Sequence, residues 1–111
     1  MDKLVTYREH VRALLRRYLT RTPPYDDVET QLIEDTRRDH YQVLSVGWDK
    51  QRRVHGCTLH LDIKQGKIWI QHNSTEDDIA KELVALGIPK DDIVLGFHAP
   101  LRRQYMEYAT N

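Results

Sequence analysis

The segment Asp62-Ile63-Lys64 has a spacing that is typical of metal-dependent nucleases. Residues two apart on a β-strand point to the same face, so this acid could hold a metal ion beside a lysine that stabilises the transition state. Such a site needs another acid, and the candidates Asp39 and Asp49 both lie in predicted polar turns, where acids are common. Two interpretations stay open: a nuclease site using Asp62 and Lys64, or a hairpin end kept soluble by its charges.

The six histidines and the single cysteine are scattered along the chain. No His-x-x-x-His pair and no Cys-x-x-Cys pair is present, so the sequence predicts no metal site and no cofactor. Cys57 falls on the apolar side of a predicted strand, where a thiol is normally inert. No Gly-x-Ser-x-Gly motif or phosphate-binding glycine loop occurs either. We therefore predict no catalytic residue and a protein that is not an enzyme.

Arginines recur at every fourth position near the amino terminus, at Arg8, Arg12 and Arg16, and therefore share one face of a predicted helix. Such a row could contact DNA phosphates. Lys plus Arg and Asp plus Glu are both 17, however, so the chain lacks the net positive charge that usually drives nucleic-acid binding. The other interpretation is a helix face that is solvated or paired with acidic groups. We expect any contact with DNA to be indirect.

Hydrophobic patterning predicts one α+β domain over residues 1–111, an antiparallel sheet of four to five strands with an amino-terminal helix and two carboxy-terminal helices. Asp2 is the expected N-cap of the first helix, which Thr22-Pro23-Pro24 follows. Thr75 is the expected N-cap of the second helix, and Gly87 ends it. The predicted elements are a helix over 4–19, strands over 28–33, 41–48, 54–63 and 68–71, a helix over 76–86, a fifth strand over 93–97 and a helix from Pro100 to Tyr108.

The hairpin that turns at Gln65-Gly66 alternates most regularly between two kinds of side chain. An aliphatic set faces one way: Cys57, Leu59, Leu61, Ile63, Ile68 and Ile70. A mixed set faces the other way, with His60 opposite Gln71 and Asp62 opposite Trp69. An aromatic side chain among polar groups is common at protein interfaces, so we predict that His60, Asp62, Trp69 and Gln71 bind a partner protein.

Two alternatives remain for that outward face. The carboxy-terminal segment could cover Trp69, or the open sheet face could allow the chain to form a homo-oligomer. The lone Cys57 and the amino-terminal sequence, which lacks a signal pattern, predict a cytoplasmic protein. No apolar run approaches the about 20 residues that cross a bilayer, so no membrane association is expected.

Several segments between Tyr7 and about Tyr108 form one ordered pattern: Gln31-Leu32-Ile33 with Asp35, Asp39-His40-Tyr41-Gln42, Val46-Gly47-Trp48, Arg52 to Cys57, His60 to Lys64, Gly66 to Gln71 and Gly87 to Leu95. This pattern resembles one known family, the XisI-like proteins, which are the fdxN-element excision controlling factors of cyanobacteria. The resemblance implies an accessory protein for excision of a DNA element during heterocyst development, acting with an endonuclease-like partner of the XisH type. It carries over no catalytic residue.

Overall fold

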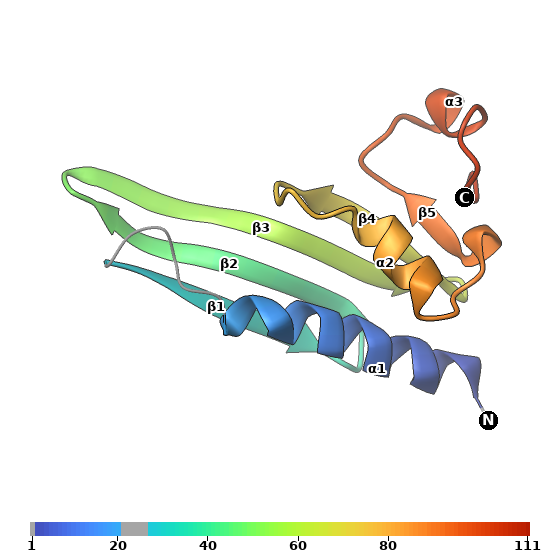
Figure 1. The fold of residues 1–111 in the computed structure, drawn as a ribbon, viewed down its shortest axis with the longest axis horizontal. Coiled ribbons are helices and arrows are strands. Elements are labelled where there is room, and N and C mark those ends of the chain that lie inside the picture. Colours follow the sequence, from blue (N-terminus) through green and yellow to red (C-terminus); the bar gives the residue numbers. More distant parts are fainter. Residues whose placement is uncertain (1, 21–26) are drawn as a thin grey trace.

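The computed structural model describes residues 2–20 and 27–111 and shows a single sheet with helices on one face (Figure 1). The sheet has five strands in the order β1-β2-β3-β4-β5. The first four strands form an antiparallel meander, and β5 runs parallel to β4. This confirms the predicted α+β class. The strands are β1 (Val28–Asp35), β2 (His40–Asp49), β3 (Arg52–Lys64), β4 (Lys67–Asn73) and β5 (Ile93–Leu95).

Helix α1 (Lys3–Arg16) crosses the sheet and is continued by a 3-10 turn, Arg17–Leu19. As predicted, Asp2 caps it: the carboxylate accepts a hydrogen bond of 2.9 Å from the backbone N–H of Leu4. The apolar positions recur with the helical period, so one stripe is buried against the sheet. This stripe consists of Tyr7, Val11, Leu14 and Leu15. The predicted Thr22-Pro23-Pro24 segment lies outside the described residues.

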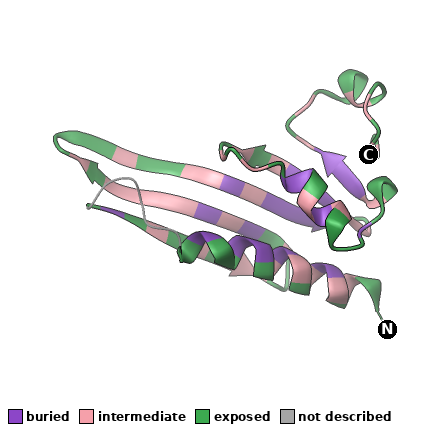
Figure 2. Ribbon diagram, in the orientation of Figure 1, coloured by how far each residue is buried: buried purple, intermediate pink, exposed green. Residues whose placement is uncertain are grey.

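The core lies between α1, α2 (Ile79–Ala85) and one face of β2, β3, β4 and β5 (Figure 2). It contains Tyr41, which is fully buried, and a layer of aliphatic side chains. The predicted inward residues Leu59, Leu61, Ile63, Ile68 and Ile70 all belong to it. Beyond the helices, the β2–β3 hairpin continues as an arm with intermediate or exposed residues (Figures 1 and 2).

A β-bulge at Thr58 corrects the predicted position of Cys57. Leu59 pairs with Val43, but Cys57 pairs with Leu44, so Thr58 is an extra residue in β3. Val43 and Leu44 point to opposite faces of β2 because side chains alternate along a strand. Cys57 therefore lies on the face opposite to Leu59, whereas the sequence placed both on the aliphatic side.

The carboxy-terminal part differs from the prediction at two helix boundaries. The side chain of Asp78, not Thr75, caps α2 by accepting from the backbone N–H of Lys81 at 3.1 Å. The helix ends at Gly87 as predicted, with a positive φ of 98°. Helix α3 (Pro100–Arg103) begins at the predicted proline but is only one turn long and stops well before Tyr108.

Segments near both ends of the chain contact β5 or the residue just before it. The phenol of Tyr7 on α1 hydrogen-bonds the carboxylate of Asp92, and Lys3 Nζ lies 3.1 Å from the same carboxylate. After α3 the chain returns to the sheet, where Ala109 bridges to Val94 and donates to the carbonyl of Ile93 at 2.9 Å. These contacts cover the outer edge of β5. In the described part of the chain, no helix is long and apolar enough to cross a membrane.

Candidate functional site

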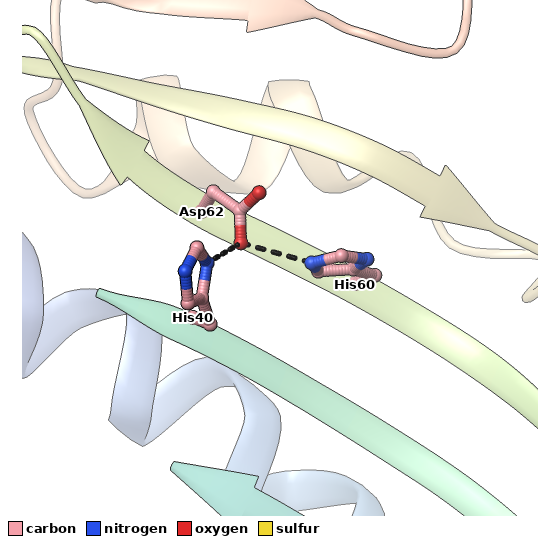
Figure 3. A group of neighbouring side chains, drawn as sticks. All are labelled: His40, His60 and Asp62. Atoms are coloured by element: carbon pink, nitrogen blue, oxygen red, sulfur yellow. Dashed lines mark hydrogen bonds and ion pairs between the residues drawn. The ribbon is translucent and has the colours of Figure 1, made fainter. Parts of the chain in front are cut away.

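A group of polar side chains converges on Asp62 at one end of β2 and β3 (Figure 3). His40 Nδ1 lies 2.8 Å from Asp62 Oδ1, and His60 Nε2 lies 2.9 Å from the same oxygen. The amide of Gln71 donates to Asp62 Oδ2 at 3.1 Å. We call these four residues the polar cluster. It lies on the sheet face away from α1 and α2, because the flanking residues Tyr41 and Leu61 enter the core.

Two irregularities in the strands assemble the polar cluster. The bulge at Thr58 shifts the β2–β3 register so that His40 pairs with Asp62. A second bulge between β3 and β4 leaves Gln71 without a pairing partner, so that His60 lies opposite His72. This corrects the prediction that His60 is opposite Gln71. Gln71 nevertheless reaches the cluster, since its side chain bonds Asp62.

Asp62 is the buried centre of the cluster, with 8% of the residue exposed. Burial alone would raise the pKa of Asp62, but the hydrogen bonds from His40, His60 and Gln71 outweigh it, and the pKa is lowered from its ordinary value. The carboxyl group is therefore held as a carboxylate inside a ring of donors. Such a group can bind a cation or donors from a partner, and it is poorly suited to release or accept protons near neutral pH.

Gly96, which follows β5, leaves room for the Gln71 side chain. A Cβ atom built on Gly96 would lie 2.5 Å from Gln71 Oε1, closer than real contacts allow, and 3.2 Å from its Cδ, which is a tight contact. The φ of Gly96 is not in the left-handed region, so space is the constraint here rather than backbone conformation. Gly96 is thus a positioning residue that lets Gln71 reach Asp62.

Trp69, predicted to face a partner, is covered by its own chain. Only 7% of this residue is exposed. Lys64 Nζ lies 4.1 Å from the ring centroid and the Arg103 guanidinium carbon lies 5.2 Å from it, so two cations engage the indole. Among the described residues, Trp69 Nε1 has no hydrogen-bond partner. Of the two readings of Trp69 in the sequence, coverage by the carboxy-terminal segment is the one observed.

Asp62 and Lys64, the two residues of the predicted nuclease motif, contact different neighbours. Lys64 lies over Trp69, and no ion pair joins Lys64 to Asp62 in the described parts of the chain. The further acid Asp39 binds Arg8 and accepts from the Tyr41 hydroxyl at 2.9 Å. Asp39 therefore does not face the same space as Asp62. This arrangement gives the nuclease interpretation no geometric support.

The predicted arginine row packs over acidic groups of the sheet. Arg8 Nε lies 2.8 Å from Asp39, while Arg12 Nε and Arg16 Nε lie 2.8 Å and 3.1 Å from the two oxygens of Glu34. The arginines on this face of α1 thus form ion pairs with acidic groups of the same chain. Pairing with acidic groups is one of the interpretations that the sequence left open. Contact of these arginines with DNA phosphates stays a prediction, and it would require exchange of Glu34 or Asp39 for phosphate.

The sequence matches the family model described as XisI protein over residues 1–110. The chain belongs to the XisI family. Its structure is similar to that of a XisI-like protein from Anabaena variabilis, with 50% sequence identity, a TM-score of 0.91, and 96% of this chain and 97% of the other covered. It is also similar to the fdxN element excision controlling factor XisI from Anabaena variabilis, with 42% identity, a TM-score of 0.86, and 99% and 100% covered. No match is found among curated proteins.

In this XisI-family chain, His40 is the site residue that sequence reasoning missed. Counting back from the β2–β3 turn, where Asp49 pairs with Arg52, places His40 opposite Leu61 instead of Asp62. Only the extra residue at Thr58 brings the imidazole and the carboxylate together. The sequence does not show where a bulge falls. The only signal for this contact was that an imidazole and a carboxylate, those of His40 and Asp62, can bond each other.

Proposed function

We propose that this protein is a controlling factor for the excision of a DNA element and acts as a non-catalytic binding subunit of an endonuclease-like partner of the XisH type. The observation that carries the proposal is the 42% identity, over 99% of this chain and 100% of the other, to a protein described as an excision controlling factor. A regulatory subunit agrees with the zero net charge of the chain, because such a protein can reach DNA through its partner.

The chemistry of the polar cluster supports binding rather than catalysis. The Asp62 carboxylate is already bonded by His40, His60 and Gln71, and Lys64 is engaged by an indole ring. A general base or nucleophile would need a free lone pair directed at a substrate. These contacts instead form a rigid polar surface, and preorganised polar groups give orientation and specificity to a protein interface.

We place the docking surface on the outward face of β2 and β3, around His40 and His60. The side chain of His40 is 55% exposed and that of His60 is 27% exposed, so both are available to a partner. Asp62 bonds both imidazoles, and Gln71 bonds Asp62. Trp69 contributes through the carboxy-terminal segment that it supports, because its ring is covered.

Co-purification with the XisH-type protein tests this proposal. The double variant His40→Ala/His60→Ala should lose most of the binding, and His10→Ala on α1 is the matched control. Trp69→Ala is a poor probe because it removes a buried ring. Full binding by the double variant would remove this face from the proposal, and absence of any complex with wild-type protein would remove the partner. A second copy of the chain is the other occupant of this face, and sedimentation of the isolated protein distinguishes it.

In the native host, loss of the gene should abolish excision of the element, and the purified protein should not cleave DNA. A magnesium-dependent cleavage that disappears in Asp62→Ala would replace the proposal with the nuclease alternative. Restoration of excision by the Asp62→Ala variant in the host would show instead that the cluster has no part in the function.

A further inference from the structure

We infer that His40, His60 and Asp62 form a binding site for one divalent transition-metal ion of the zinc type. These residues lie on two neighbouring strands, and their side chains point toward one another (Figure 3). Each offers one ligand atom, and the three atoms all lie within 4.8 Å of one another. The inference concerns the isolated chain and does not depend on the proposed function.

The spacing of the three atoms is close to that of a metal centre. In a tetrahedral zinc site with bonds of about 2.0–2.1 Å, neighbouring ligand atoms are about 3.3 Å apart. Here His40 Nδ1 and His60 Nε2 lie 2.8 Å and 2.9 Å from Asp62 Oδ1. Metal binding would therefore lengthen these two contacts by a few tenths of an ångström and bring the two imidazole nitrogens, which lie within 4.8 Å of each other, to about the same spacing.

The donor set selects the class of metal. Two imidazoles and one carboxylate suit zinc and its neighbours in the first transition row, whereas magnesium and calcium prefer oxygen ligands. One carboxylate leaves a bound divalent ion with a net charge of +1, which a position at the protein surface tolerates. The nearest lysine along β3, Lys64, is held over Trp69 and forms no ion pair with Asp62 in the described parts of the chain.

The surroundings resemble those that support metal ligands. Metal-binding carboxylates are themselves hydrogen-bonded, and loss of such a support typically weakens metal binding about 10- to 100-fold. Gln71 provides this contact by donating to Asp62 Oδ2, the oxygen that faces away from the two imidazoles. The site is also accessible, because the His40 side chain is 55% exposed. Three protein ligands leave a fourth position open to water or to a group from a bound molecule.

The competing explanation is a hydrogen-bonded clamp that binds no ion, and titration of the purified protein with Zn²⁺ separates the two. We expect one ion per chain with a dissociation constant of about 10 μM or below. His40→Gln, which changes a largely exposed side chain, should weaken binding at least about 10-fold, and Asp62→Asn at least about 100-fold. Gln71→Met, which touches no metal, should weaken it about 10- to 100-fold. His55→Gln, an exposed histidine of the same strand, should bind as the wild type does.

Two further measurements make the result decisive. Co²⁺ should give the intense visible absorption of a low-coordinate site in wild-type protein and in His55→Gln, but not in His40→Gln. Mg²⁺ at the same concentration should not compete. Absence of stoichiometric Zn²⁺ binding by the folded wild-type protein overturns the inference. So does equal Zn²⁺ affinity in wild-type protein, His40→Gln and Asp62→Asn, with circular dichroism confirming that each variant is folded.

Discussion

Arg8 on α1 holds Asp39 in the β1–β2 turn through two parallel contacts, Nε to Oδ1 at 2.8 Å and Nη2 to Oδ2 at 3.1 Å. This bidentate geometry is the stronger form of an arginine–carboxylate pair. Asp39 also has a positive φ of 63° and gives its carbonyl to the N–H of Ile63 at 3.0 Å. The pair therefore fixes the first helix to the turn that precedes His40.

Loss of this pair should lower the melting temperature. Arg8→Ala leaves the Asp39 carboxylate, whose side chain is 13% exposed, without its cation. Asp39→Asn is the partner substitution, because asparagine tolerates the positive φ at this position. In a double-mutant cycle the second substitution should add little to the first. The control is Arg52→Ala, which changes an exposed arginine of the hairpin arm. Additive changes in melting temperature for Arg8→Ala and Asp39→Asn would contradict the coupling.

Arg103 should determine whether the carboxy-terminal segment stays folded onto the sheet. It donates to the carbonyls of His98 at 3.0 Å and Thr110 at 3.2 Å, and it lies over Trp69. Arg103→Ala should therefore speed amide hydrogen exchange in residues 96–111 by at least about 10-fold and leave β2 and β3 unchanged. Arg102→Ala, its exposed neighbour, is the control. Uniform acceleration over the whole chain would show that the segment does not open on its own.

Gly96→Ala should disturb the polar cluster through Gln71. The new methyl group would occupy the position next to the Gln71 amide, so the amide should leave Asp62, at a cost of about 1–3 kcal/mol in the free energy of unfolding. Denaturant unfolding measures this cost. Gly56→Ala is a matched control, because a Cβ there meets nothing within 4 Å. Equal stability of the two variants would mean that Gln71 adapts freely.

Stability should depend on pH at both extremes. Burial, together with the hydrogen bond to Asp92, raises the pKa of Tyr7 to about 12. The unfolded chain loses this proton near pH 10, so the contribution of Tyr7 is present below about pH 10 and is lost as the pH rises to about 12. Tyr7→Phe should reduce this alkaline slope in the free energy of unfolding, and the rest belongs to Tyr41 and Tyr108, whose pKa values burial also raises. If Tyr7→Phe leaves the alkaline slope unchanged, the slope belongs to another group.

On the acid side, Asp39 should give the opposite dependence. The hydrogen bond from Arg8 lowers the pKa of Asp39 despite its partial burial. The contribution of Asp39 is therefore present above about pH 3.9, the ordinary value for the unfolded chain, and is lost as the pH falls through the lower folded value. Denaturant unfolding between about pH 2 and pH 5 measures it. Asp39→Asn should make the profile shallower in that window, where Asp35, Asp62 and Asp92, whose pKa values are also lowered, still contribute.

Glu34 should control whether α1 can bind DNA. Its carboxylate pairs with both Arg12 and Arg16, so we expect wild-type protein to bind duplex DNA weakly. Glu34→Gln should free both guanidinium groups, strengthen binding and steepen the decline of affinity with salt between about 50 and 200 mM. Glu29→Gln on the same strand is the control. Equal affinity of wild-type protein and Glu34→Gln would exclude this arginine row from DNA contact.

Much of the fold follows from local patterns in the sequence. The stripe of α1, its Asp2 cap, the Gly87 stop and the pairing of Ile63 with Ile68 all depend on residues close together in the chain. Helix α2 starts three residues later than predicted because Thr75, Asp77 and Asp78 are all good N-cap residues, and the sequence does not show which of them caps the helix. The parallel pairing of β5 depends on distant contacts, which periodicity does not reveal.

The candidate site was only half predictable. Strand alternation correctly placed His60 and Asp62 on the outward face, and Asp62 opposite Trp69. The approach of His40 required the bulge at Thr58, and a bulge is set by the packing of both strands rather than by a sequence signal. The coverage of Trp69 depends on Arg103, more than thirty residues later, so the sequence alone left that face undecided.

The contact between Tyr7 and Asp92 also bears on the order of events during synthesis. The residues are 85 positions apart, so a nascent chain that has already released its first helix from the ribosome still lacks the acid that holds the start of this helix. In the β1–β3 meander, each strand pairs only with strands that are next to it in the sequence. The meander can therefore form earlier. We therefore expect the first turns of the amino-terminal helix to gain their final contacts only when translation is almost complete, after the rest of this helix has docked on the earlier strands.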